Sequence, residues 1–156
     1  MNLRIEPMTA ESAAAIGRWR HPPPYDTYDF HVGEERALLI AEYRYHRVLD
    51  GDELVGYCCF GDEGRVPGGV YADEALDMGW GMRPDLNGRG LGQEFAAAIV
   101  AFARAAYRPR MMRVTIADFN VRSQKVAARV GFTIARERFT SASGMDFTVW
   151  VSTPEP

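Results

Sequence analysis

The sequence predicts one domain of the mixed α/β class over residues 1–156. Three observations lead to this prediction. Along the whole chain, segments in which apolar and polar residues alternate are followed by segments with helical periodicity. Short turns separate these segments, without linkers or internal repeats. A length of 156 residues with 47% hydrophobic content is sufficient for one sizeable buried core.

The N-terminal half is expected to form strands and two helices. Residues 3–8 alternate as a strand, and helical spacing follows them directly and again over residues 34–42. Residues 45–49 and 54–60 alternate on either side of an Asp-Gly pair, which is typical of a hairpin turn. These strands should therefore pair in an antiparallel meander.

In the C-terminal half, predicted strands and helices also follow one another along the chain. Apolar residues at helical spacing predict helices over residues 91–106 and 120–130. Strands are predicted over residues 76–83, 112–117, 132–139 and 147–151. The whole chain then holds about seven strands in a mixed, mostly antiparallel twisted sheet, flanked by about four helices.

Composition limits the function classes. The 18 Lys and Arg against 21 Asp and Glu give a net charge of −3, so no general nucleic-acid or membrane surface is expected. The two cysteines, Cys58 and Cys59, are adjacent in an apolar run and should be reduced core residues rather than metal ligands. No signal-peptide pattern and no long apolar stretch is found, so we expect a cytoplasmic protein without a bound metal.

The most informative stretch is the glycine-rich turn that follows the strand 76–83. Glycines at a helix start leave peptide N–H groups open to a phosphate. A Rossmann fingerprint is excluded because Gln93 takes the place of its third glycine, and a P-loop is excluded because no Gly-Lys-Ser or Gly-Lys-Thr occurs. A pyrophosphate held by backbone N–H groups remains, unless the glycines only make a tight connection. The turn consists of Asn87, Gly88, Arg89, Gly90, Leu91 and Gly92.

This turn resembles the coenzyme A pyrophosphate motif of the GCN5-related N-acetyltransferases (GNAT). Asn87-x-x-Gly90-x-Gly92 is similar to the family's Arg/Gln-x-x-Gly-x-Gly/Ala, with Asn87 as a departure. Residues 120–132 are similar to the family's second motif, an Asn, a helix and then Gly-Phe. The resemblance implies the GNAT fold and acetyl-CoA as co-substrate. Many members have a Tyr that acts as general acid at the position of Ala127. The second motif without this Tyr resembles the Rim-type branch, which acetylates ribosomal-protein N-termini.

The resemblance also implies roles for individual residues. A backbone N–H of residues 81–83, on the strand before the turn, should meet the thioester carbonyl, and we expect that of Met82. Asn120 should contact the pantetheine or an ordered water, although Asn is also a common helix cap, and both roles can hold together. Ser123, one turn further along the helix, should face the cofactor. Because thiols ionise near pH 8.5, the departing thiolate needs no dedicated acid.

For the general base, we expect Asp77, which lies on the same strand where relatives often carry a Glu. The competing interpretation is a solvated carboxylate at a strand edge. Glu74 and His31 are alternatives. The acceptor pocket is expected to contain Trp80, Tyr25 and Tyr28, with core packing as the alternative for each.

These observations predict an acetyl-CoA-dependent N-acetyltransferase that acts on a primary amine of a small molecule, a peptide N-terminus or a lysine. The alternative is a coenzyme A-binding module without catalysis, which serves sensing or interaction. Two copies could pair through the C-terminal strands as a homodimer. The acceptor is not readable from the sequence, because binding loops carry no general code.

Overall fold

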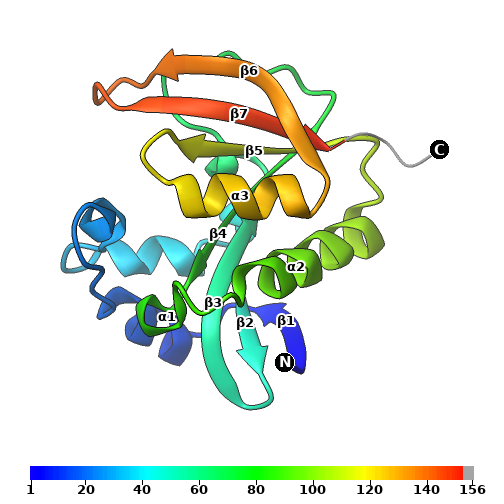
Figure 1. The fold of residues 1–156 in the computed structure, drawn as a ribbon. Helices are drawn as coiled ribbons and strands as arrows, with labels where there is room; N and C mark the ends of the chain where they lie inside the picture. Colours follow the sequence, from blue (N-terminus) through cyan, green and yellow to red (C-terminus); the bar gives the residue numbers. More distant parts are fainter. Residues whose placement is uncertain (153–156) are drawn as a thin grey trace.

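The computed structural model describes residues 1–152 and contains one seven-stranded sheet in the order β1-β2-β3-β4-β5-β7-β6 (Figure 1). All neighbouring strands are antiparallel except β4 and β5, which are parallel. The predicted class, a mixed and mostly antiparallel sheet with flanking helices, is confirmed. The strands are β1 (Leu3–Pro7), β2 (His46–Asp50), β3 (Glu53–Phe60), β4 (Leu76–Met82), β5 (Met112–Ala117), β6 (Phe132–Thr140) and β7 (Asp146–Ser152).

Three α-helices occur in the described residues: α1 (Ala10–Gly17), α2 (Gly92–Tyr107) and α3 (Val121–Arg129). The helix predicted over residues 34–42 forms instead as two 3-10 turns, η2 (Glu34–Leu39) and η3 (Ala41–Tyr43). Ile40 between them has extended dihedrals, and in this segment only Leu38 is buried. The predicted single α-helix therefore does not form, and Ile40 separates two short 3-10 turns. Further 3-10 turns are η1 (Tyr25–Tyr28), η4 (Asp62–Gly64) and η5 (Pro84–Leu86).

The apolar core has two parts. The larger one joins the sheet to α2, whose residues Phe95, Ile99 and Ala103 are almost fully buried. The smaller one lies under α1 and η2 and contains Ala13, Ile16 and Leu38. The spacing of three or four residues along α2 explains its placement, because it puts one apolar stripe against the strands.

Cys58 and Cys59 lie buried in β3 as free thiols, as expected from their adjacency. Burial raises the pKa of Cys59 to about 12, so it is protonated at neutral pH. No group of three His, Cys, Asp or Glu side chains within residues 1–152 is arranged to hold a metal ion. Across the same residues, no helix has the length and apolar character needed to cross a membrane.

The parallel strands β4 and β5 stay together over only part of their length. Their register runs from Leu76 opposite Met112 to Met78 opposite Val114 and ends there. Beyond this point β4 continues along β3 and β5 continues along β7. The sheet therefore splits at its centre, and both strands present unpaired edges to the gap.

Candidate active site

A cleft of about 600 Å³ opens where β4 and β5 separate. This volume lies within the usual range of small-molecule sites. Strand residues Gly79 to Met82 line one wall and Val114 to Ala117 line the other. The glycine turn, the start of α3, η1 and η4 complete the lining. The cleft is thus built on the split in the sheet.

Met82 directs its peptide N–H into this gap. On β4, the N–H of the next residue, Arg83, donates to the carbonyl of Val55 on the β3 side at 2.8 Å. Because successive peptide groups of a strand point to opposite sides, the Met82 N–H points away from β3. On that side β5 has already diverged. The predicted donor for a carbonyl oxygen is therefore available in the cleft.

The glycine turn presents a series of unpaired donors. Gly88 and Gly90 both have φ of +77°, the left-handed conformation that glycine adopts without steric cost. Within residues 1–152, the peptide N–H groups of residues 88–91 have no hydrogen-bond partner. Helix α2 begins directly after them without a side-chain cap. Such a turn at a helix N-terminus can bind a phosphate.

Gly92 is required for a different reason from the glycines before it. A Cβ atom at Gly92 would lie 2.8 Å from Cγ2 of Val126 on α3. This contact is too short, so a side chain here would push the two helices apart. At Gly90 no atom lies within 4 Å of a Cβ position, so its requirement is conformational.

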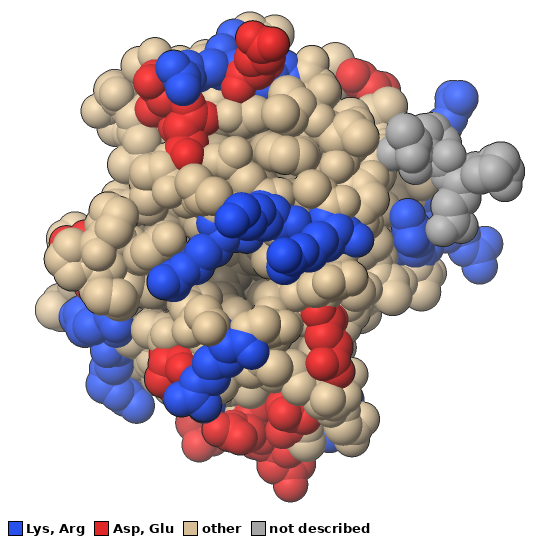
Figure 2. Space-filling model, in the orientation of Figure 1, with Lys and Arg blue, Asp and Glu red and all other residues tan. Residues whose placement is uncertain are grey.

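Helix α3 adds positive charge to the same end of the cleft. Arg122, Lys125 and Arg129 all line it. Their spacing puts them along one side of the helix. Figure 2 shows a band of basic side chains across the middle of this face, over α3. The band complements an anionic ligand at the neighbouring glycine turn.

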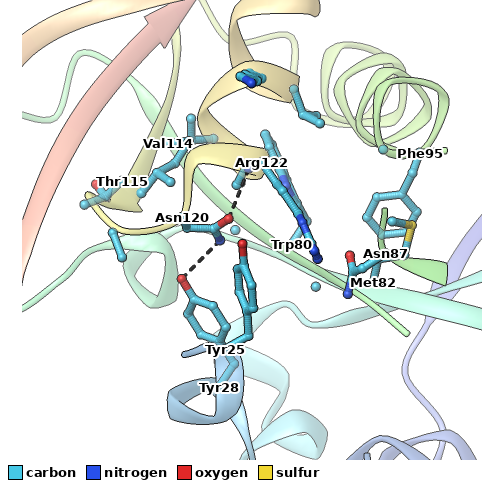
Figure 3. A pocket seen from close by; sticks show the side chains of 18 of the residues that line it. Tyr25, Tyr28, Trp80, Met82, Asn87, Phe95, Val114, Thr115, Asn120 and Arg122 are labelled. Carbon is cyan, nitrogen blue, oxygen red and sulfur yellow. Dashed lines mark hydrogen bonds between the residues drawn. The ribbon is translucent and has the colours of Figure 1, made fainter. Parts of the chain in front are cut away.

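Asn120 connects α3 to the segment on the other side of the cleft. Its side-chain oxygen accepts a hydrogen bond from the N–H of Ser123 at 3.1 Å and so caps the helix. Its amide nitrogen donates to the hydroxyl of Tyr28 at 3.2 Å (Figure 3). The capping role is therefore shown, together with a second role that holds η1 in place.

Aromatic rings form the opposite half of the cleft. Tyr25 and Tyr28 rise from η1 toward Asn120 and pack on Phe119, with ring centres 5.7 and 5.8 Å away (Figure 3). The guanidinium of Arg122 lies 4.9 Å from the Tyr25 ring centre. Burial raises the pKa of Tyr28 above its ordinary value, although the hydrogen bond from Asn120 acts in the opposite direction. Burial likewise raises the pKa of Tyr57, which also lines the cleft.

Asp77 does not fit the general-base role that the sequence favoured. Its side chain is 2% exposed and does not line the cleft. Arg113 binds both carboxylate oxygens at 2.7 and 2.8 Å, and Arg65 donates to Oδ2 at 2.9 Å. With both oxygens engaged by guanidinium groups, Asp77 holds the loop before β4 against the sheet and has no approach to a substrate amine.

The remaining predicted residues divide by location. Those that line the cleft are Met82, Asn87, Gly88, Gly90, Gly92, Asn120, Ser123, Trp80, Tyr25 and Tyr28. The side chains of Arg89 and Leu91 do not line it, because Arg89 is exposed and Leu91 packs on the core. Glu74 and His31 are also exposed away from it.

Several lining residues were not predicted. The basic residues of α3 could have been found from their helical spacing directly after Asn120. His21 and Glu63 had no such signal, because the fold brings them to the cleft from separate loops.

Comparisons with known proteins agree with this architecture. Solved structures with the same fold include an acetyltransferase of the GNAT family from Bacillus anthracis, with a TM-score of 0.76, 17% identity, and coverage of 98% of this chain and 95% of that one. The aminoglycoside acetyltransferase AAC(6')-Ib in complex with coenzyme A has a TM-score of 0.74 at 16% identity, over 97% of this chain and 94% of that one.

A further structure, the N-acetyltransferase PseH from Campylobacter jejuni in complex with acetyl coenzyme A, has a TM-score of 0.70 at 16% identity, over 98% of this chain and 99% of that one. No protein of curated function matches the sequence. The model of the acetyltransferase (GNAT) domain family matches residues 2–133. This match spans most of the chain, including the split strands, the glycine turn and α3. The chain therefore belongs to the acetyltransferase (GNAT) domain family and is an acyltransferase by class.

Proposed function

We propose that this protein transfers the acetyl group of acetyl-CoA to a primary amine, carried by a small molecule, a peptide N-terminus or a lysine side chain. The observation that supports this most is the position of the Met82 N–H. It points into the gap between β4 and β5, on the strand that leads directly into a turn of unpaired N–H groups. The same cleft thus offers hydrogen-bond donors for a carbonyl oxygen on β4 and for an anion on the turn that follows β4.

The proposed coenzyme A site uses the glycine turn for the pyrophosphate. Asn87, Gly88 and Gly90 line the cleft there, and the N–H groups of residues 88–91 have no other partner within the described chain. Arg122, Lys125 and Arg129 supply the charge that a phosphate ester requires. The residues present therefore fit coenzyme A. Solved relatives of the same fold were crystallised with coenzyme A or acetyl coenzyme A.

In the proposed reaction, a peptide group rather than a side chain stabilises the thioester carbonyl. The Met82 N–H donates a hydrogen bond to the carbonyl oxygen as negative charge develops on it. The amine nitrogen forms the new C–N bond, and the C–S bond breaks with its electron pair on sulfur. A thiol of ordinary pKa near 8.5 is an adequate leaving group at neutral pH.

We also propose that the protein is closest to the Rim-type branch of the family. Asn120 and Ser123 are followed by Ala127 rather than Tyr, and Ala127 is fully buried against the core. A leaving-group acid from this helix position is therefore absent. A preference for peptide N-termini over small polyamines and aminoglycosides would support this placement, and the reverse preference would contradict it.

The direct test is release of thiol from acetyl-CoA in the presence of a panel of amines that covers peptides, polyamines, aminoglycosides and lysine derivatives. We expect thiol release above the hydrolysis background with at least one class, and acetylated product by mass spectrometry. Binding of acetyl-CoA should be followed in parallel by calorimetry. Tight binding without turnover on the whole panel would favour the non-catalytic coenzyme A-binding module.

A further inference from the structure

His21, which lines the cleft together with Tyr25 and Tyr28, forms a pair with the carboxylate of Asp29. The Nδ1 atom of His21 lies 2.7 Å from Oδ1 of Asp29. The peptide N–H of His21 donates to the same oxygen at 2.8 Å. Two contacts to one carboxylate oxygen fix both the backbone and the ring, so the ring orientation is determined by the fold.

This pair selects one tautomer of the ring. An ionised carboxylate only accepts hydrogen bonds, so Nδ1 carries the proton and donates it to Asp29. Nε2 is then the nitrogen with a lone pair. Within residues 1–152 it has no hydrogen-bond partner, and His21 lines the cleft. An oriented imidazole with an open Nε2 is the arrangement that accepts a proton.

The pair is connected to the centre of the cleft. His21 makes an edge contact with Tyr28, with ring centres 6.3 Å apart. The Tyr28 hydroxyl in turn accepts the hydrogen bond from Asn120, the residue that caps α3. Tyr28 therefore contacts both His21 and Asn120, so His21 belongs to the aromatic part of the cleft.

We propose that His21 is the proton acceptor for the amine and that Asp29 is its positioning residue. This inference rests on the proposed function. Nε2 takes one proton from the substrate ammonium, and the freed lone pair of the nitrogen forms the C–N bond. The C–S bond breaks, the thiolate takes the second amine proton, and the imidazolium returns its proton to water. The products are the amide, the free thiol and one released proton.

The charged surroundings of His21 are consistent with this role. Arg20 precedes it and directs its guanidinium to the carbonyls of Gly17 and Trp19. Burial raises the pKa of the Asp29 carboxyl, but the hydrogen bonds from His21 outweigh this effect and the pKa is lowered overall. Asp29 is therefore ionised at neutral pH. Besides Asp29, Tyr28 is a titratable side chain in contact with the ring, and burial raises its pKa.

The cleft contains one competing carboxylate. Glu63 lines it from η4, and its Oε1 accepts a hydrogen bond from the Tyr45 hydroxyl at 3.1 Å. Glu63 is exposed and no second residue fixes its orientation within residues 1–152. A proton acceptor held in one orientation is more effective than a mobile one. The test below therefore includes substitutions of both His21 and Glu63.

The experiment uses the full chain, acetyl-CoA and the best amine of the panel, with kcat/KM measured across pH. We expect His21→Gln to lower kcat/KM about 100-fold or more at neutral pH and to remove the acidic limb of the profile. Asp29→Asn should give a smaller loss and move that limb to lower pH, because the imidazolium loses its negative partner. Added imidazole should restore part of the rate of His21→Ala, which a purely structural role does not predict.

The controls separate the possible outcomes. His31→Gln alters an exposed histidine outside the cleft and should leave the profile unchanged. Acetyl-CoA affinity and thermal unfolding show whether each variant is folded. A wild-type protein without turnover would overturn the proposed function. A wild-type protein with turnover whose His21→Gln variant keeps its rate and acidic limb, or whose Glu63→Gln variant loses them, would overturn only the role of His21.

Discussion

The two halves of the cleft are built in different ways. The half proposed for coenzyme A consists of two continuous segments, the strand and turn of residues 78–92 and the helix α3 with its cap at residues 120–129. Much of it is backbone: a free N–H on β4, a left-handed turn and the start of α2. The half proposed for the acceptor is assembled from side chains on the loop between α1 and η1, on η1 itself, and on β3, η4 and β4, which are far apart in the sequence.

Two aspartates show what this difference means. Asp77 lies on the strand of the coenzyme half, where a sequence motif points to it, but two arginines enclose it. Asp29 lies in a loop without a motif, yet it orients a histidine in the cleft. The motif therefore led to residues that line the cleft, but the carboxylate it pointed to is held by arginines and does not line it. The following predictions test this division, starting with the largest expected effect.

Asp77→Ala should reduce the free energy of unfolding by about 3–5 kcal/mol, because it leaves the buried Arg113 without its partner. Chemical denaturation measures this loss. Asp73→Ala removes an exposed partner of Arg65 and should change stability little. An Asp77→Ala variant that is as stable as the wild type but has a lower acetyl-transfer rate at neutral pH would indicate that Asp77 takes part in the reaction. This result would contradict the contrast drawn between Asp77 and Asp29.

Gly90→Val should weaken acetyl-CoA binding at least about tenfold, because a β-branched residue resists the left-handed conformation that aims the N–H groups. Calorimetry gives the affinity. Gly144→Val is the matched control, since Gly144 has φ of +89° and open space around it but lies in the β6–β7 turn. Equal affinities for the two variants would contradict the backbone site. Gly92→Val is less informative, because it also strains the contact with Val126.

Lys125→Gln should weaken acetyl-CoA binding about 3- to 10-fold at low ionic strength, and the difference should shrink in salt because exposed charges are screened. Titrations at two salt concentrations provide the measurement. Arg110→Gln, which removes an exposed cation that does not line the cleft, serves as the reference. An effect of Lys125→Gln that is independent of salt would argue for packing rather than charge.

Tyr28→Phe should raise KM for the amine about 2- to 10-fold with little change in acetyl-CoA affinity. The ring keeps its packing on Phe119, but the hydrogen bond that ties η1 to Asn120 is lost. Steady-state kinetics with varied amine measures the effect. Tyr43→Phe, outside the cleft, should behave as the wild type. Loss of acetyl-CoA affinity instead would show that η1 belongs to the coenzyme half.

The sequence by itself determined the sheet, the order of its elements and the location of the glycine turn, because periodicity and turn chemistry are local properties. The same local signals, together with Asn120 and the Gly-Phe that follows α3, were sufficient for the family. They were not sufficient for residues 34–42, where an extended Ile40 replaced the predicted helix with 3-10 turns.

Only the tertiary structure decided which titratable groups reach the cleft. Asp77 and Arg113 face each other because β4 and β5 are in register at that point, and the same strands separate two positions later. His21 meets Asp29 through the path of one loop. Contacts between residues distant along the chain depend on register and loop conformation, and neither is encoded in local periodicity. The glycine turn that lines the cleft could therefore be predicted from its backbone pattern, whereas the pairing of His21 with Asp29 could not.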